Sequence, residues 1–137
     1  MSVEQNKAIE RRYKEAVWDR HDPGAIDEFV DPGFVHHNPA MGQDAGRDGL
    51  RQTLAALFAA FPDVQLTHDD LIGEEDKIVE RWSARGTHRG ELMGMPATYR
   101  EVTMEGVDIY RYANGKRVEA WTYWDLQRFM KQLGALR

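Results

Sequence analysis

The chain of 137 residues is 42% hydrophobic and 30% charged, a composition typical of one globular domain. Lysine and arginine number 18 against 23 aspartate and glutamate residues, and the resulting net charge of −5 disfavours a nucleic acid or an anionic membrane as partner. The sequence has no cysteine, which excludes disulfides, thiolate metal ligands and a cysteine nucleophile.

Neither a membrane span nor a secretory leader is indicated by the sequence. Its apolar runs are far shorter than the roughly 20 residues that a spanning helix needs. Residues 1–5 lack the basic and apolar parts of a signal peptide. No repeat or linker-like stretch divides the chain. We therefore expect one domain over residues 1–137, located in the cytoplasm.

Helices are expected in the first half of the chain. Ser2 and Gln5 have the spacing of a capping box, which marks a helix start, and Pro62 marks a helix end. Apolar residues at helical spacing predict three helices, at residues 2–19, 25–29 and 50–61. A short strand-like segment, residues 34–39, separates the second helix from the third.

Strands are expected in the second half, where apolar and polar residues alternate from Val64 onward. Between turn signals, this period of two predicts strands at residues 64–72, 77–88, 99–113 and 116–125. A short helix follows from Leu126 and ends at Gly134. Helices followed by a sheet predict an α+β fold.

The turn Asn114–Gly115 joins the last two strands and is a strong hairpin signal, because both central residues of such a turn need positive φ. Counting outward from a two-residue turn places Asp108 opposite Trp121, unless a bulge shifts the pairs. One face of the hairpin would then mix aromatic rings with carboxylates: Met104, Asp108, Tyr110, Tyr112, Glu119, Trp121, Tyr123 and Asp125. We interpret this face as the lining of a ligand cavity, with a solvent-facing sheet as the alternative.

Several short segments, in order along the chain, are similar to one known family. These segments are His37-Asn38-Pro39, Phe61-Pro62-Asp63, Arg85-Gly86-Thr87-His88, Asn114-Gly115-Lys116, Glu119-Ala120-Trp121 with Asp125, and Gln132-Leu133-Gly134. They resemble the SnoaL-like polyketide cyclases, also called ester cyclases, of the nuclear-transport-factor-2-like superfamily. The resemblance implies a cone-shaped α+β fold, in which three N-terminal helices pack on a strongly curved antiparallel sheet around a cavity, with a short C-terminal helix.

The resemblance also implies an activity. Characterised members of the family close a ring on an aromatic polyketide ester by an intramolecular aldol condensation, and they use an aspartate as acid/base and no metal or organic cofactor. By motif match this aspartate is Asp125, which we expect at the closed end of the cavity. The alternative role for Asp125 is the N-cap of the last helix. Other members of the superfamily are isomerases, hydratases, epoxide hydrolases or non-catalytic binding domains, and these functions stay open.

Further residues are candidates for catalysis or substrate binding. His88 could polarise a carbonyl or relay a proton, or it could be a structural histidine. Asn38 could donate its amide to an oxyanion or belong to a turn, and its neighbour His37 is a second candidate for substrate binding. Arg81 could bind an acid group of the ligand or lie in a dimer contact.

The aromatic candidates Trp121, Tyr123 and Tyr110 would form flat walls for a planar ligand, or they would only fill the core. Asp108 is either a second acid or a solvated charge, and convergence with another carboxylate would raise one of the two pKa values.

We expect a small organic ligand as partner, without cofactor or metal. The segments with His36, His37, His68 and Asp69-Asp70 follow no usual metal-binding spacing. The aliphatic hairpin face, with Val107, Ile109, Val118, Ala120 and Trp124, predicts a homodimer formed through the outer side of the sheet.

Overall fold

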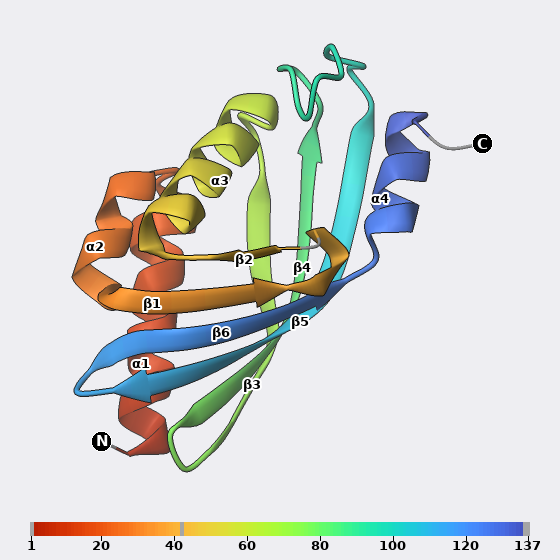
Figure 1. The fold of residues 1–137 in the computed structure, drawn as a ribbon. Coiled ribbons are helices and arrows are strands. Elements are labelled where there is room, and N and C mark those ends of the chain that lie inside the picture. Colours follow the sequence, from red (N-terminus) through yellow and green to blue (C-terminus); the bar gives the residue numbers. More distant parts are fainter. Residues whose placement is uncertain (1, 42, 136–137) are drawn as a thin grey trace.

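The computed structural model describes residues 2–41 and 43–135, and its helices and strands follow the expected order, except that a short strand at residues 43–45 was not expected. The helices are α1 (Val3–Tyr13), α2 (Ile26–Phe29), α3 (Arg47–Ala60) and α4 (Leu126–Leu133). The strands are β1 (Val30–Asn38), β2 (Gln43–Ala45), β3 (Gln65–Glu74), β4 (Lys77–Thr87), β5 (Glu101–Ala113) and β6 (Lys116–Trp124). Figure 1 shows these elements along the chain.

Helix α1 begins with the predicted capping box. The Ser2 hydroxyl accepts from the Gln5 amide at 3.1 Å, and the Gln5 side chain accepts from the Ser2 amide at 2.8 Å. The helix continues into a π-helical segment, Lys14–Asp19, which confirms the predicted end near residue 19. Among residues 2–41 and 43–135, no helix has the length and apolar character needed to cross a membrane.

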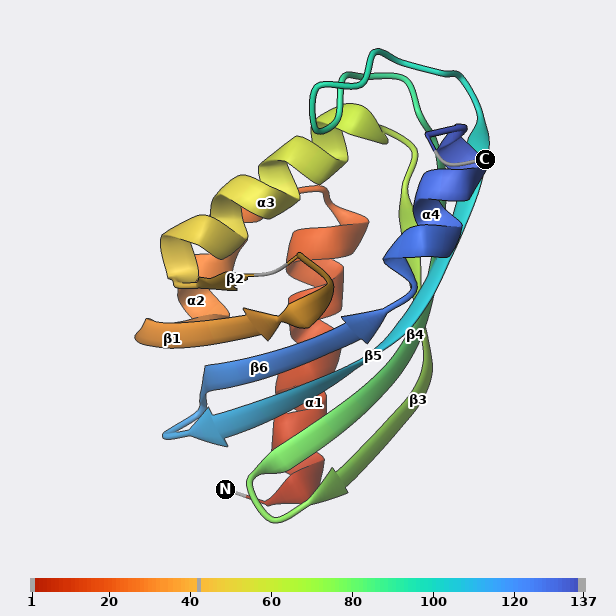
Figure 2. The same cartoon turned by 45° about the vertical axis from the view of Figure 1, so that its right-hand side comes forward.

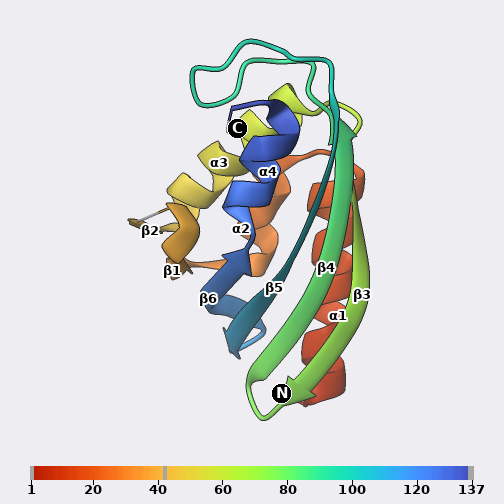
Figure 3. The same ribbon diagram turned by 90° about the vertical axis from the view of Figure 1, so that its right-hand side faces the viewer.

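The six strands form one sheet in the order β2-β1-β6-β5-β4-β3. The sheet is strongly curved, and α3 lies over β1 (Figure 2) while α1 lies along β3 and β4 (Figure 3). The expected cone-shaped α+β fold is therefore confirmed. One pair departs from the expected antiparallel sheet, because β1 runs parallel to β6.

The register of the last hairpin differs from the prediction by one residue. Asn114 and Gly115 have φ values of 53° and 78°, as the turn requires. Beyond the pair Tyr112↔Arg117 the register shifts, because Val118 is an extra residue on β6. A shift by one residue turns every following side chain to the other side of the sheet.

The bulge changes which β6 residues face inward. Thr122, and not Trp121, lies opposite Asp108, and the inner side of β6 carries Ala120, Thr122 and Trp124. Trp121 and Tyr123 lie on the outer side, where Tyr123 is 51% exposed. The predicted inward orientation of Trp121 and Tyr123 is therefore wrong, whereas the prediction for Asp108 and Tyr110 on β5 is confirmed.

Candidate active site

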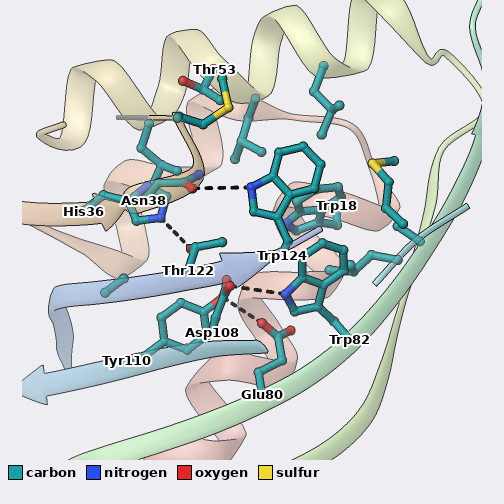
Figure 4. Close-up of a pocket in the computed structure, with 18 of the residues that line it drawn as sticks. Trp18, His36, Asn38, Thr53, Glu80, Trp82, Asp108, Tyr110, Thr122 and Trp124 are labelled. Atoms are coloured by element: carbon teal, nitrogen blue, oxygen red, sulfur yellow. Dashed lines mark hydrogen bonds between the residues drawn. The ribbon is translucent and has the colours of Figure 1, made fainter. Parts of the chain in front are cut away.

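A cavity of about 360 Å³ lies between the concave side of the sheet and α3 (Figure 4). This volume suits a small organic molecule. Most of the lining is apolar, and the aromatic rings of Trp18, Trp82 and Trp124 contribute flat surfaces. Most of the polar lining residues come from the strands, namely His36, Asn38, Glu80, Asp108, Tyr110, Arg117 and Thr122, and Glu10 of α1 and Thr53 of α3 add to them.

Asp108 is the acid best placed in the cavity. Its Oδ1 accepts from Trp82 Nε1 at 3.2 Å, its Oδ2 lies 2.5 Å from the Tyr110 hydroxyl, and the Thr122 hydroxyl also hydrogen-bonds to it. The pKa of Asp108 is raised to about 7, mainly by burial and in addition by the nearby Glu80 carboxylate, while the hydrogen bonds from Tyr110, Trp82 and Thr122 act to lower it. Asp108 can therefore be found both protonated and ionised near neutral pH.

A glycine makes room for one of these hydrogen bonds. Gly106 pairs with Trp82 across β4 and β5, and a Cβ atom at position 106 would lie 2.7 Å from the Trp82 ring. Because glycine has no side chain, the indole can lie across the strand and reach Asp108.

Tyr110 stands between two carboxyl groups. Its hydroxyl oxygen lies 2.5 Å from Asp108 Oδ2 and 2.7 Å from Glu80 Oε2. A phenol has one hydrogen and can donate it to only one of these oxygens. The other contact is a hydrogen bond only if that carboxyl is protonated and donates to Tyr110. The geometry therefore implies a proton shared within the group Asp108, Tyr110 and Glu80, in agreement with the raised pKa of Asp108.

Arg117 closes the polar side of the cavity. Its guanidinium lies between the rings of Tyr13 and Tyr110, 4.0 Å and 3.7 Å from the two centroids. Both Glu10 oxygens accept from Arg117 Nη2, at 2.8 Å and 2.6 Å, and Tyr112 donates to Glu10 as well. Burial raises the pKa of Glu10, whereas Arg117 acts to lower it. This paired arrangement makes two buried charges tolerable inside an apolar core.

Glu10, His68 and Glu80 bring potential metal-ligand atoms within 4.8 Å of one another. However, both oxygens of Glu10 already accept hydrogen bonds from Arg117, and Tyr112 adds another. A dication at this position would also be repelled by the adjacent guanidinium. The donor set therefore suits protons better than a metal ion.

Two further contacts complete the cavity. His36 Nε2 lies 2.6 Å from the Thr122 hydroxyl, which connects it to Asp108. Asn38 Oδ1 accepts from Trp124 Nε1 at 3.3 Å, so that the amide nitrogen of Asn38 can serve as a donor toward a ligand. The expected cavity position of Asn38 is confirmed.

Asp125, by contrast, lies outside the cavity. Its side chain is exposed and accepts from the Arg128 amide at 2.9 Å, which makes it the N-cap of α4. The expected position at the closed end of the cavity is wrong, and the alternative role as a cap is confirmed. The physical reason is that β6 ends at Trp124, so Asp125 stands at the start of α4 and its side chain bonds the backbone of the first helical turn.

His88 also lies away from the cavity lining. It is fully buried, and its Nδ1 is 3.1 Å from the Thr98 amide and 2.9 Å from the Thr98 hydroxyl. Its ring packs against Phe61 with centroids 5.4 Å apart. These contacts fit the alternative of a structural histidine that holds the loop before β5.

The outer side of the sheet carries the remaining candidates. His37 Nε2 lies 2.8 Å from Glu119, and its ring stacks on Trp121. Arg81 pairs with Asp70 at 2.8 Å and is mostly exposed. The structure therefore brings Asn38, Asp108 and Tyr110 together in the cavity and leaves His37, Arg81, Trp121 and Tyr123 outside it.

Sequence reasoning missed the acidic and basic residues at the polar side of the cavity. Glu80 stands in a run of inward residues, between Ile78 and Trp82, where the period of two predicts an apolar side chain. Such a charged residue at a core position was the available signal. Glu10 gave a similar signal on the buried side of α1. Arg117 gave no such signal, because the bulge that follows it changes which residues of β6 face the cavity.

Comparison with known proteins places the chain in a family. The family model for the SnoaL-like polyketide cyclase matches residues 7–133. The aklanonic acid methyl ester cyclase DauD of Streptomyces sp. (strain C5) is 29% identical over 112 residues, which are 80% of this chain and 66% of DauD, just under two thirds of its length. The nogalonic acid methyl ester cyclase of Streptomyces nogalater is 29% identical over 113 residues, covering 80% of this chain and 83% of that protein.

A solved structure agrees with the sequence matches. AclR of Streptomyces galilaeus, a proposed hydroxylase, superimposes with a TM-score of 0.88 at 29% identity and covers 99% of this chain and 100% of its own. The same scaffold thus occurs under different activity names. Because the family model spans nearly the whole chain, the protein belongs to the SnoaL-like polyketide cyclase family.

Proposed function

We propose that the protein is a cyclase that closes a ring on a polyketide-type ester by an intramolecular aldol reaction, with Asp108 as the acid/base residue. Family membership and the ester cyclases among its relatives support the reaction type. The single observation that carries the assignment of Asp108 is its position in an apolar cavity, beside Tyr110 and Glu80, with a pKa raised by burial to about 7. A pKa near the working pH is the best compromise for a group that must both accept and donate a proton.

The reaction can be written with this chain's own residues. The Asp108 carboxylate removes a proton from the carbon next to a ligand carbonyl, and the resulting enolate oxygen accepts a hydrogen bond from the Asn38 amide. The enolate carbon then bonds to a second carbonyl carbon of the same molecule. The alkoxide formed there takes the proton back from Asp108, so the residue ends as it began. The apolar walls keep water away from the enolate.

The cavity walls support an aromatic ligand. Trp18, Trp82 and Trp124 line the cavity with flat faces, and Met104 adds an adaptable side chain to the lining. The three tryptophans thus provide the flat walls that were expected from Trp121 and Tyr123.

Turnover of aklanonic acid methyl ester and nogalonic acid methyl ester, the compounds named for the relatives, tests this function. We expect Asp108→Asn to lower turnover by about 100-fold or more with unchanged folding by circular dichroism. Asp125→Asn is the matched control, because it changes the exposed cap by the same chemistry and asparagine is an equally good N-cap. Equal loss in both variants, or loss in Asp125→Asn alone, would contradict the assignment.

We also propose a homodimer formed through the outer side of the sheet. Val107 and Ile109 on β5 lie there as expected, next to Trp121 and Tyr123 on β6, whereas Ala120 and Trp124 of the expected patch face the cavity. The pairs Arg111–Glu119 and Arg81–Asp70 border this apolar strip with both signs of charge, which suits pairing of the surface with itself. Sedimentation at micromolar concentration should give a dimer, and Ile109→Glu should give a monomer.

A further inference from the structure

A continuous line of polar contacts leads from the cavity to the edge of the sheet. Asp108 Oδ2 lies 2.5 Å from the Tyr110 hydroxyl, which lies 2.7 Å from Glu80 Oε2. The other oxygen of Glu80, Oε1, lies 2.5 Å from His68 Nε2. The Glu80 side chain is 2% exposed and the His68 side chain is 11% exposed, so the line ends where the imidazole meets solvent.

The geometry points to a proton relay formed by Asp108, Tyr110, Glu80 and His68, in which His68 exchanges protons with water. This inference rests on the proposed acid/base role of Asp108. His68 acts through Glu80 and Tyr110 and does not touch the ligand, so it is a positioning residue and not a catalytic one.

The contact between His68 and Glu80 joins two buried polar atoms. His68 Nε2 and Glu80 Oε1 are both buried, and within the described part of the chain neither atom has a hydrogen bond to any other group. Their separation of 2.5 Å meets the distance for an ion pair, although the angles fall outside ordinary hydrogen-bond geometry. Two buried polar atoms that have only each other must share a proton, because two bare lone pairs at this distance would repel.

The position of His68 in the sheet explains its access to water. β3 is the edge strand of the sheet, and its register shifts between His68 and Asp70. A bulge at a sheet edge re-aims the neighbouring side chain, and His68 points inward to Glu80 on β4. The charged groups that face the imidazole are Glu80 on β4 and Glu10 on α1, and Glu10 is in turn bound by Arg117 of β6.

A route for protons is needed because Asp108 starts each turnover in one of two states. With a pKa of about 7, a large fraction of the molecules hold a protonated Asp108 at neutral pH and cannot act as the base. A ligand in the apolar cavity would close the direct path between Asp108 and water. The relay lets the occupied site lose that proton through the sheet without releasing the ligand.

The proton balance of one outward transfer is simple. Asp108 gives its proton to the Tyr110 oxygen while the Tyr110 hydrogen moves to Glu80 Oε2. The hydrogen on Glu80 Oε1 moves to His68 Nε2, and His68 Nδ1 gives its hydrogen to water. One proton enters the chain and one leaves, so Tyr110 and Glu80 end neutral. The reverse sequence, started by protonation of Nδ1, restores the first arrangement and re-protonates Asp108.

A titration tests the relay without any substrate. Carboxyl-carbon NMR of the wild type should show Asp108 titrating near pH 7. His68→Gln should raise the apparent pKa of Asp108 by about one unit, because the imidazole that accepts the proton from Glu80 is lost and the proton stays on the cluster. His21→Gln is the control, since His21 is a partly buried histidine that binds the Val64 carbonyl away from this cluster. Titration curves that are the same in His68→Gln and wild type would overturn the relay.

Turnover with the two methyl esters provides the second readout. His68→Ala should turn over more slowly, by less than the ~100-fold expected for Asp108→Asn, and added imidazole should restore its rate in proportion to concentration. His21→Ala should show no such rescue. Tyr110→Phe should remove the rescue from the His68→Ala protein, because it interrupts the relay between Glu80 and Asp108. A rate of His68→Ala equal to wild type, or a loss that imidazole cannot restore, would contradict the relay.

The outcomes separate the two proposals. If the wild type turns over neither ester but His68→Gln still shifts the NMR titration of the cluster, the proposed function fails for these esters and the proton path stands. If Asp108→Asn abolishes turnover while the His68 variants keep wild-type titration and rate, the function stands and the relay fails. Should His68→Ala not fold, the same rate comparison is made with His68→Gln, whose side chain keeps the hydrogen-bonding capacity but cannot carry a proton.

Discussion

Asp108 and Thr122 lie opposite each other on β5 and β6, and their side chains are hydrogen-bonded within the cavity. The Thr122 hydroxyl is also 2.6 Å from His36 Nε2, so one hydroxyl joins the imidazole of β1 to the carboxyl of β5. This three-residue line adds to the contacts with Trp82 and Tyr110 and holds Asp108 in one orientation.

The activity should rise with pH through the neutral range. Burial raises the pKa of Asp108 to about 7, and only its ionised form can remove a proton from carbon. Since the ionised fraction grows as pH passes upward through this pKa, kcat/KM should show a rising limb with a midpoint near 7. A pH series with either methyl ester measures it, and a limb near the ordinary aspartate pKa of about 4 would contradict the assignment.

The Thr122 hydroxyl should influence the pH at which kcat/KM rises. Thr122→Val keeps the side-chain shape but removes a hydrogen bond that lowers the pKa of Asp108. We therefore expect the rising limb to move to higher pH, with slower turnover at pH 7 and partial recovery at higher pH. The same pH series checks this, and Thr103→Val, at an exposed position on β5, is the control. An unchanged midpoint would mean that Thr122 has no influence on Asp108.

Removal of the α4 cap should affect stability and leave turnover nearly unchanged. In Asp125→Ala the Arg128 amide loses its acceptor, and such a loss costs about 0.5–2 kcal/mol of unfolding free energy. Asp125→Asn should cost far less, because asparagine can accept the same hydrogen bond. Urea denaturation of the two variants provides the comparison. A cost of the same size in both would argue against capping.

Arg117 should be essential to the core. Arg117→Met leaves Glu10 as an unpaired buried carboxyl, and breaking a buried pair in this way typically costs about 3–5 kcal/mol. The double change Arg117→Met with Glu10→Leu removes both polar groups and should recover much of the loss. Chemical denaturation of the wild type, the single variant and the double variant measures the difference. Equal stability of the single and double variants would show that the pair is not coupled.

Much of the architecture followed from local pattern. The capping box at Ser2, the helical spacing up to Pro62, the alternation from Val64 onward and the Asn114–Gly115 turn each act over a few residues, and each predicted its element correctly. The order of these elements gave the α+β fold, and short motifs in the same order pointed to the family. Asp108 and Tyr110 were also placed on the inner face, because β5 keeps an uninterrupted period of two up to these residues.

The tertiary structure alone decided which residues form the site. One extra residue at Val118 reverses the faces of β6, so Thr122 and Trp124 enter the cavity and Trp121 and Tyr123 leave it. The polar cluster is assembled from separate elements, namely Glu10 of α1, His68 of β3, Glu80 of β4, Tyr110 of β5 and Arg117 of β6. Local spacing cannot predict such a cluster, because a bulge costs little locally and the contacts exist only after the curved sheet has closed around α1.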